Sequence, residues 1–187
     1  MAEDPRQVRT REALTRVLLE LLEAKTFVSI SVSQLCAAAN VHRTTFYKHA
    51  GSIEEFAVDV ITRELDAIAT VTASDRDQLT VYGDAMVEVL EHVAGERAIY
   101  RPLLFSKWGS ALRAAIDARM QGRVRIALDV FAAQDGVQVP PHRDEIVAFV
   151  SGGLVGTIVA WAMSDDTDAV GWAARVQALI RAWWTVS

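Results

Sequence analysis

Cysteine and proline are scarce in this chain of 187 residues, which contains one cysteine, Cys36, and four prolines. A single cysteine excludes an intramolecular disulfide and a cysteine-based zinc site. Few prolines, together with 51% hydrophobic residues, favour a compact helical protein over a disordered one. We interpret Cys36 as a buried structural thiol, because it falls on the apolar side of a predicted helix. A redox-sensing thiol is the alternative.

Features typical of enzymes are also missing. No nucleophile–base–acid set and no glycine-rich phosphate loop stand out in the sequence. Glu88 and His92 lie one helical turn apart and could hold a metal ion. No third ligand is identifiable, however, and a solvated helix face is the simpler interpretation. We therefore expect a protein without enzymatic activity, metal or cofactor.

The start of the chain, residues 1–11, is charged and contains no apolar run, so we expect no signal peptide and a cytoplasmic protein. Residues 146–163 carry no charge and approach the length of a membrane span. Serine, threonine and three glycines interrupt this stretch, and acidic residues flank it on both sides without a basic cluster. We therefore predict a buried helix there and no membrane association.

Acidic residues are absent from Ala24 to Ile53, although the whole chain has a net charge of −5. The same interval contains lysine, arginine and histidine side chains. A local basic face on an acidic body is typical of a specific DNA-binding protein rather than of an indiscriminate one.

This interval also contains a predicted helix–turn–helix. Ser31 is a suitable N-cap, and Gln34 three residues later can complete a capping box. Apolar residues at helical spacing follow. Asn40 tolerates a left-handed backbone, so it can end the first helix in a sharp turn. A second short helix is predicted over residues 42–49.

Most side chains of this second helix can form hydrogen bonds to DNA. A helix fits the major groove, where Arg43 can bind guanine O6 and N7. The threonines can reach a base edge, and Tyr47 and Lys48 suit phosphate oxygens. The candidate DNA-binding residues are Ser31, Ser33, His42, Arg43, Thr44, Thr45, Tyr47, Lys48 and His49. A polar surface helix without this function is the alternative.

The segment resembles the DNA-binding domain of the tetracycline-repressor (TetR) family of bacterial regulators, which shows the pattern I-A-x-x-A-G-V-S, then T-x-Y-x-H-F, then a Lys-Glu-Glu-Leu-like helix start. The matching residues are Ser31, Leu35, Cys36, Ala39, Asn40, Val41, Thr45, Tyr47, His49, Glu54, Glu55 and Phe56. Asn40, His42, Ala50 and Ile53 depart from the usual Gly, Ser, Phe and Lys. The last departure puts one backbone contact to DNA in doubt. The resemblance is specific over about the first 65 residues and one of architecture beyond them.

Helical patterns continue through the rest of the chain. We expect helices over about 5–25, 52–72, 79–94, 96–105 (broken by Pro102), 106–134, 143–163 and 168–184. The predicted fold is all-α with about nine helices. A three-helix DNA-binding domain and its linker helix form residues 1–72. A helical ligand-binding and dimerisation domain forms residues 73–187, with the boundary at 73–77.

The resemblance implies two further sites in the second domain. Its last helix pair would form a dimer interface, for which the candidates are Gly152, Gly153, Gly156, Trp161, Trp172 and Trp183. An apolar pocket between helices would hold a small-molecule effector, with the candidates Tyr82, Met86, Tyr100, Leu104, Trp108, Met120, Phe131 and Phe149. Internal packing is the alternative for both sets.

Together these features predict a regulator, and a repressor in particular, that binds double-stranded DNA as a homodimer at a pseudo-palindromic operator. A small-molecule effector would release it by favouring the state that does not bind DNA. A helical dimerisation or adaptor protein that no longer binds DNA is the alternative from another class.

Overall fold

The computed structural model describes residues 4–24, 30–68, 78–133 and 141–184. Within these residues the fold is all-α, as predicted, and no strand occurs. The helices are α1 (Pro5–Glu23), α2 (Val32–Ala38), α3 (Arg43–Phe46), α4 (Ile53–Ile68), α5 (Gln78–Gly95), α6 (Arg97–Phe105), α7 (Gly109–Ala132), α8 (Arg143–Met163) and α9 (Ala169–Trp184).

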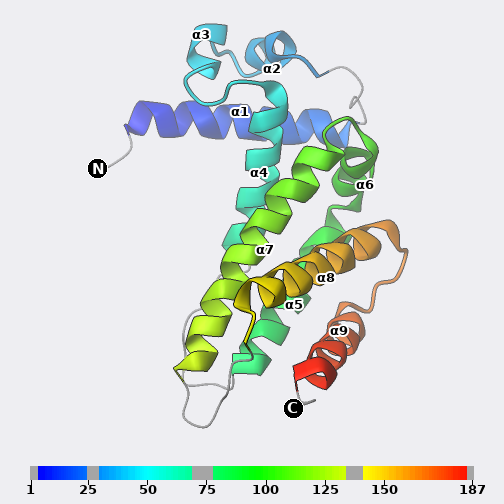
Figure 1. Ribbon diagram of the computed structural model, residues 1–187. Helices are drawn as coiled ribbons and strands as arrows, with labels where there is room; N and C mark the ends of the chain where they lie inside the picture. The colour runs from blue at the N-terminus through cyan, green and yellow to red at the C-terminus, as the bar shows by residue number, and fades with distance from the viewer. Residues whose placement is uncertain (1–3, 25–29, 69–77, 134–140, 185–187) are drawn as a thin grey trace.

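The first four helices build a small head at one end of the molecule. Figure 1 shows α1 running crosswise to α4, with α2 and α3 at the outer end, farthest from α8 and α9. Apolar side chains from all four helices meet in the head core, where Leu18, Leu35, Phe46 and Phe56 are fully buried. Burial of about 1.5–3 kcal/mol per such side chain is what holds helices as short as α2 and α3 in place.

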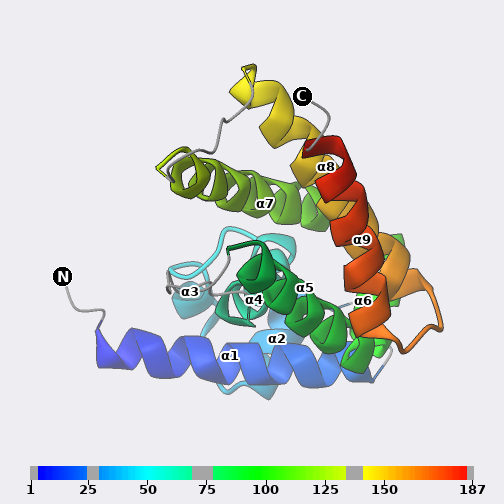
Figure 2. The ribbon, with the colours of Figure 1, turned by 90° about the horizontal axis from the view of Figure 1, so that it is seen from below.

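Helices α5 to α9 form the body, into which α4 descends beside α7 (Figures 1 and 2). Helix α7 packs on α8, and α9 packs on α5. The buried residues of the head and most of those of the body belong to one continuous cluster, because α4 contributes to both. The predicted boundary at 73–77 lies outside the described residues, so the division into 1–72 and 73–187 stays a prediction.

Helix α8 is, among the described residues, the one helix long and apolar enough to cross a membrane by length and composition. It packs against α5, α6 and α7, and Ile146, Val147, Ile158 and Trp161 are buried in the protein core. The prediction of a buried core helix therefore holds for one side of α8, and the other side is exposed.

Two predicted helix boundaries were wrong. The second helix of the motif covers only Arg43–Phe46, and turns occupy residues 47–49. Pro102 does not break α6, which continues to Phe105. Proline costs α6 one backbone hydrogen bond, but burial of Ile99, Tyr100 and Leu103 from the same helix offsets that loss.

Asn40 adopts the predicted left-handed conformation, with φ of 52°. The amide of Asn40 donates to Ala37 O at 3.3 Å, and the amide of Val41 donates to Cys36 O at 2.9 Å. This pair of bonds is the Schellman arrangement, which satisfies the last carbonyls of α2 and reverses the chain toward α3.

Replacing Asn40 with alanine is expected to lower the free energy of unfolding by about 1 kcal/mol, because a Cβ without a polar group disfavours this backbone region. Replacing it with glycine is expected to change stability by less than about 0.5 kcal/mol. Urea denaturation followed by circular dichroism measures both changes. Equal stability of the alanine and glycine variants would contradict the assignment of strain to this residue.

Candidate nucleic-acid interface

Helix α2 begins at a complete capping box. The Ser31 amide donates to Gln34 Oε1 at 2.9 Å, and the Gln34 amide donates to Ser31 Oγ at 3.2 Å. The two residues therefore satisfy each other's orphan donors at the helix start, as the sequence predicted. Because both ends of α2 are fixed by local hydrogen bonds, the chain enters α3 in one direction only.

Helix α3 is anchored by a single buried side chain. Phe46 is fully buried and contacts the rings of Tyr47 and Phe56 edge to face, with centroids 5.5 and 5.6 Å away. His42 occupies the N-cap position but its side chain makes no capping hydrogen bond. One aromatic anchor thus holds a short helix whose other side chains face outward.

The predicted DNA-binding residues all lie on this outer end of the head. Seven of the nine are exposed, and the remaining two, Thr45 and His49, are half-buried. Tyr47 is 50% exposed although its ring is apolar. Exposed aromatic and cationic side chains beside threonines give both stacking surface and hydrogen-bond donors. Most of these side chains are therefore accessible to another molecule, whereas His49 also lines a cleft between the head and the body.

Cys36 lies beneath this surface. Burial raises the pKa of its thiol, and the Arg43 guanidinium acts in the opposite direction to a smaller extent. The thiol is therefore protonated at neutral pH, and a protonated buried thiol is a poor nucleophile. These properties favour the structural interpretation of Cys36 over redox sensing.

The predicted effector residues do not share one environment. Tyr100, Trp108 and Met120 are buried in the core, whereas Met86 and Leu104 are partly buried against it. Phe149 differs from the expectation, because it is 66% exposed on the outer side of α8. The side chains of Tyr82 and Phe131 lie outside the described part of the chain.

Tyr100 is the most polar of these core residues. Its hydroxyl lies 3.2 Å from Nε2 of His92. Burial raises the pKa of Tyr100, helped by the nearby carboxylates of Glu64 and Glu96, and burial lowers the pKa of His92. Both side chains are therefore neutral at physiological pH, and their contact is a neutral hydrogen bond inside the body.

The predicted dimer residues divide in a similar way. Gly152, Gly153 and Gly156 are exposed, and a Cβ on any of them would meet nothing within 4 Å. Trp172 is half-buried. Trp161 differs from the expectation, because it is fully buried in the core of its own protomer. The side chain of Trp183 lies outside the described part of the chain.

Sequence reasoning missed the apolar residues that accompany these glycines. A groove of about 430 Å³ runs between α8 and α9, and its lining includes Gly153, Gly156, Trp172 and Leu179. Exposed apolar side chains lie along the same two helices, namely Phe149, Met163, Val170 and Leu179. Exposed apolar side chains beside an apolar groove are typical of a site that another molecule covers.

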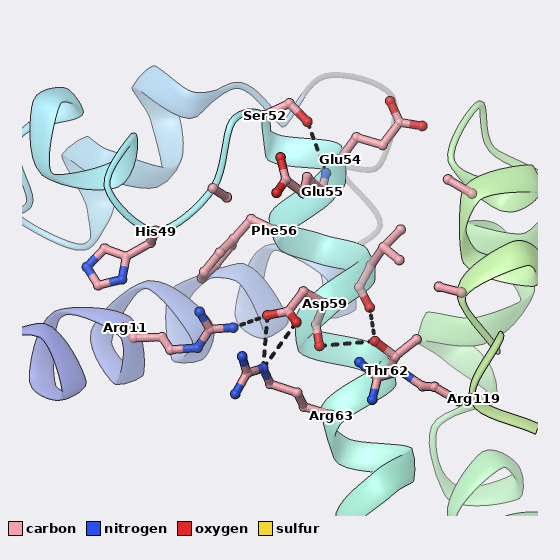
Figure 3. A pocket seen from close by; sticks show the side chains of 14 residues that line it. Arg11, His49, Ser52, Glu54, Glu55, Phe56, Asp59, Thr62, Arg63 and Arg119 are labelled. Atoms are coloured by element: carbon pink, nitrogen blue, oxygen red, sulfur yellow. Dashed lines mark hydrogen bonds and ion pairs between the residues drawn. The ribbon is translucent and has the colours of Figure 1, made fainter. Parts of the chain in front are cut away.

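Sequence reasoning also missed a cleft between the head and the body, which is shown in Figure 3. We call it the head–body cleft. Its volume is about 600 Å³, and its lining residues come from α1, the α3–α4 turn, α4 and α7. No signal in the sequence could have revealed it, because its two walls are about 50 residues apart in the chain.

Part of the chain is similar in sequence to a bacterial regulator. The chain is 39% identical over 61 residues to an uncharacterized HTH-type transcriptional regulator, YxbF, of Bacillus subtilis (strain 168). The match covers 32% of this chain and 16% of that regulator's length. No protein-family profile matches the chain.

The whole fold is similar to a solved structure, the dihydroxyacetone kinase operon activator DhaS. The TM-score is 0.68 at 12% sequence identity, and the alignment covers 96% of this chain and 98% of the other. At this identity the likeness shows the fold alone. The chain therefore shares its all-helical fold with that protein.

Proposed function

We propose that the protein is a cytoplasmic DNA-binding transcriptional regulator of TetR type, and a repressor that binds a pseudo-palindromic operator as a homodimer. The observation that carries this proposal is the helix–turn–helix itself. Its first helix is capped at both ends, and its second helix exposes Arg43 and Thr44, followed by Tyr47 and Lys48 in the turn after it.

The exposed side chains would have two different roles at the DNA, contacts to base edges and contacts to phosphates. Arg43 and Thr44 stand at the start of α3, which is the part of a recognition helix that contacts base edges. Lys48 and Tyr47 follow at its end and suit phosphate oxygens, which fix the position of the helix without specifying sequence. Ser31 and Ser33 at the start of α2 are placed to contact the neighbouring backbone.

Selection of bound duplexes from a random DNA pool at near-physiological salt tests the proposal. Enrichment of one inverted repeat is the expected result, because two identical heads read two half-sites related by symmetry. Weak binding that disappears as salt rises, with no enriched sequence, would reject specific DNA recognition. The alternative of a dimerisation or adaptor protein would then be preferred.

The homodimer in this proposal uses the outer face of α8 and α9. The apolar groove at Gly153 and Gly156 and the exposed Phe149 and Leu179 support a partner of the same kind, since a second copy would bring the same complementary surface. Binding of such a dimer to an inverted repeat requires that its two heads lie about 34–36 Å apart, or a multiple of that distance.

Replacing Gly156 with glutamate is expected to weaken dimerisation about tenfold or more, because the new side chain would occupy the groove and its charge would lose water on association. The protomer should keep its fold, since a Cβ at Gly156 meets nothing within 4 Å. Analytical ultracentrifugation measures the change in dimer dissociation. The control is Ala114→Glu, which adds the same charge at an exposed position on α7. Equal dimerisation of the two variants would reject this interface.

Release by an effector completes the proposal. A small molecule changes the population of DNA-competent heads only if it binds the other state more tightly. Helix α4 is the physical connection for such an effect, because it belongs to the head at its start and packs on α5 and α7 further along.

A further inference from the structure

The head–body cleft has one wall from the head and one from the body. Thr62 of α4 lines it on the side of Arg119 in α7, together with Ala111 and Ala115, whereas Phe56 and Asp59 line it on the side of Arg11 (Figure 3). Figure 3 shows α4 between the Arg11 and Arg119 side chains. The cleft stays open because the α7 residues opposite α4 are two alanines one turn apart, whose side chains are too short to fill it.

Below these alanines, ion pairs join α7 to α4. Arg119 and Arg123, one turn apart on α7, both bind the carboxylate of Asp66 near the end of α4. Arg123 also donates to the backbone carbonyl of Asp66 at 3.4 Å. The lower end of the cleft is therefore fixed by charged contacts, whereas the upper part between α4 and the two alanines is empty of such contacts among the described residues.

Cationic groups outnumber carboxylates at this lower end. Asp59 binds Arg11 and also Nε of Arg63 at 3.0 Å, so each of the two aspartates on α4 serves two guanidinium groups. An arginine side chain has five N–H donors, and Asp59 engages one nitrogen each of Arg11 and Arg63. Each aspartate thus leaves one positive charge in excess, and Arg119, which shares Asp66 with Arg123, carries this excess on the α7 side of the cleft, where it favours an anion.

The other end of the cleft carries the opposite charge. Glu54 and Glu55 lie near Ser52 at the start of α4, away from Arg11, Arg63 and Arg119 (Figure 3). Glu55 already accepts a hydrogen bond from the Gly51 amide at 2.9 Å. An anionic group would thus be repelled from this end and held at the arginine end. The middle of the cleft is lined by Val58, Ala111 and Ala115, which suit an apolar part of the ligand.

From this arrangement we infer that the head–body cleft binds a small organic acid, whose carboxylate contacts Arg119 and whose apolar part lies on Val58, Ala111 and Ala115. The volume of about 600 Å³ is within the range of small-molecule sites. An occupant would touch the head and the body at once, so it would hold α4 at one distance from α7. This consequence for DNA rests on the proposed function, whereas the binding itself does not.

Calorimetric titration with benzoate tests the binding, with benzamide as the uncharged molecule of nearly the same shape. Hexanoate and octanoate extend the series, and all titrations keep the ionic strength constant. Benzoate or one of the aliphatic acids is expected to bind, and benzamide to bind about tenfold more weakly, because the charged hydrogen bonds are lost. Backbone amide shifts at Ala111 and Ala115 should locate the site. Failure of every acid to bind, or equal binding of benzamide, would overturn the inference.

Two pairs of variants separate recognition from structure. Arg119→Gln is expected to lower the affinity for the acid about tenfold or more, whereas Arg123→Gln, which removes the other partner of Asp66 but does not line the cleft, should retain it. Ala115→Leu should abolish binding by filling the cleft without changing a charge. Ala114→Leu, at the exposed neighbouring position, should not. Unchanged binding in Ala115→Leu would exclude this site.

The effect of the acid on DNA binding is measured separately, as the affinity for the selected operator with and without the acid. A chain that binds the acid at the cleft but selects no operator would remove the proposed function and leave the site in place. A chain that binds its operator but no acid would overturn the cleft inference alone. A change in operator affinity that Ala115→Leu abolishes would establish that the cleft regulates the head.

Discussion

Replacing Trp161 with alanine will lower the free energy of unfolding by about 3–5 kcal/mol. The side chain is fully buried, and its Nε1 donates to the Leu90 carbonyl at 2.6 Å. Its ring contacts Trp172, with centroids 5.1 Å apart, and the Arg97 guanidinium lies 4.8 Å above it. One side chain thus connects α8 with α5, α6 and α9, so its loss leaves a large cavity and removes the hydrogen bond to Leu90.

Chemical denaturation of the variant measures this loss, and Phe149→Ala is the matched control. Both residues are large aromatics on α8, but Phe149 is 66% exposed and should cost the protomer less than about 1 kcal/mol. Both substitutions are best compared in the Gly156→Glu background, so that subunit dissociation does not contribute. An equal loss for the two variants would show that α8 packs with a different face toward the core.

The helix–turn–helix could be predicted from sequence because its signals are local. The capping pair Ser31 and Gln34 is three residues apart, and α2 ends in bonds from Asn40 to Ala37 and from Val41 to Cys36, three and five positions earlier. Each of these interactions closes within one or two turns of chain. The residue types therefore determine the geometry with little help from the rest of the protein.

The orientation of α8 could not be predicted in this way. The helix is apolar on every side, so its periodicity does not indicate which face packs inward. Trp161 and Phe149 were consequently given roles that their positions do not support. Only the packing of α5, α6 and α7 against α8 decides that Trp161 is buried and that Phe149 is exposed.

Contacts between distant segments could not be predicted from the sequence either. Arg101 donates from Nε to the Ala162 carbonyl at 2.8 Å and pairs with Asp165, so a residue of α6 satisfies the end of α8 across 61 positions. The head–body cleft depends in the same way on two alanines of α7 facing α4. An alanine in a helical pattern can pack against a neighbouring helix or can line a cleft. The sequence does not distinguish these two cases, and the tertiary structure does.

Replacing Arg43 with alanine is expected to cost the dimer about 2–6 kcal/mol of operator affinity, because each of two heads loses a contact worth about 1–3 kcal/mol. Arg43 is exposed at the first position of α3, where a guanidinium can bind a guanine edge with two hydrogen bonds. Competition binding with the selected operator and with half-sites altered one base pair at a time measures the loss. Preference for one base pair of each half-site should relax, while binding to unrelated DNA changes little.

Two further substitutions distinguish reading of a base from attraction to phosphate. Lys48→Ala removes the same charge from the end of the motif, and it should weaken binding to all sequences alike and reduce the salt dependence by about one ion per head. Arg125→Ala removes an exposed charge from α7 in the body and should leave operator affinity unchanged. If Arg43→Ala behaves as Lys48→Ala does, α3 is held at the phosphates and sequence must be read by other residues of the head. If it behaves as Arg125→Ala does, the exposed face of α3 does not meet DNA at all.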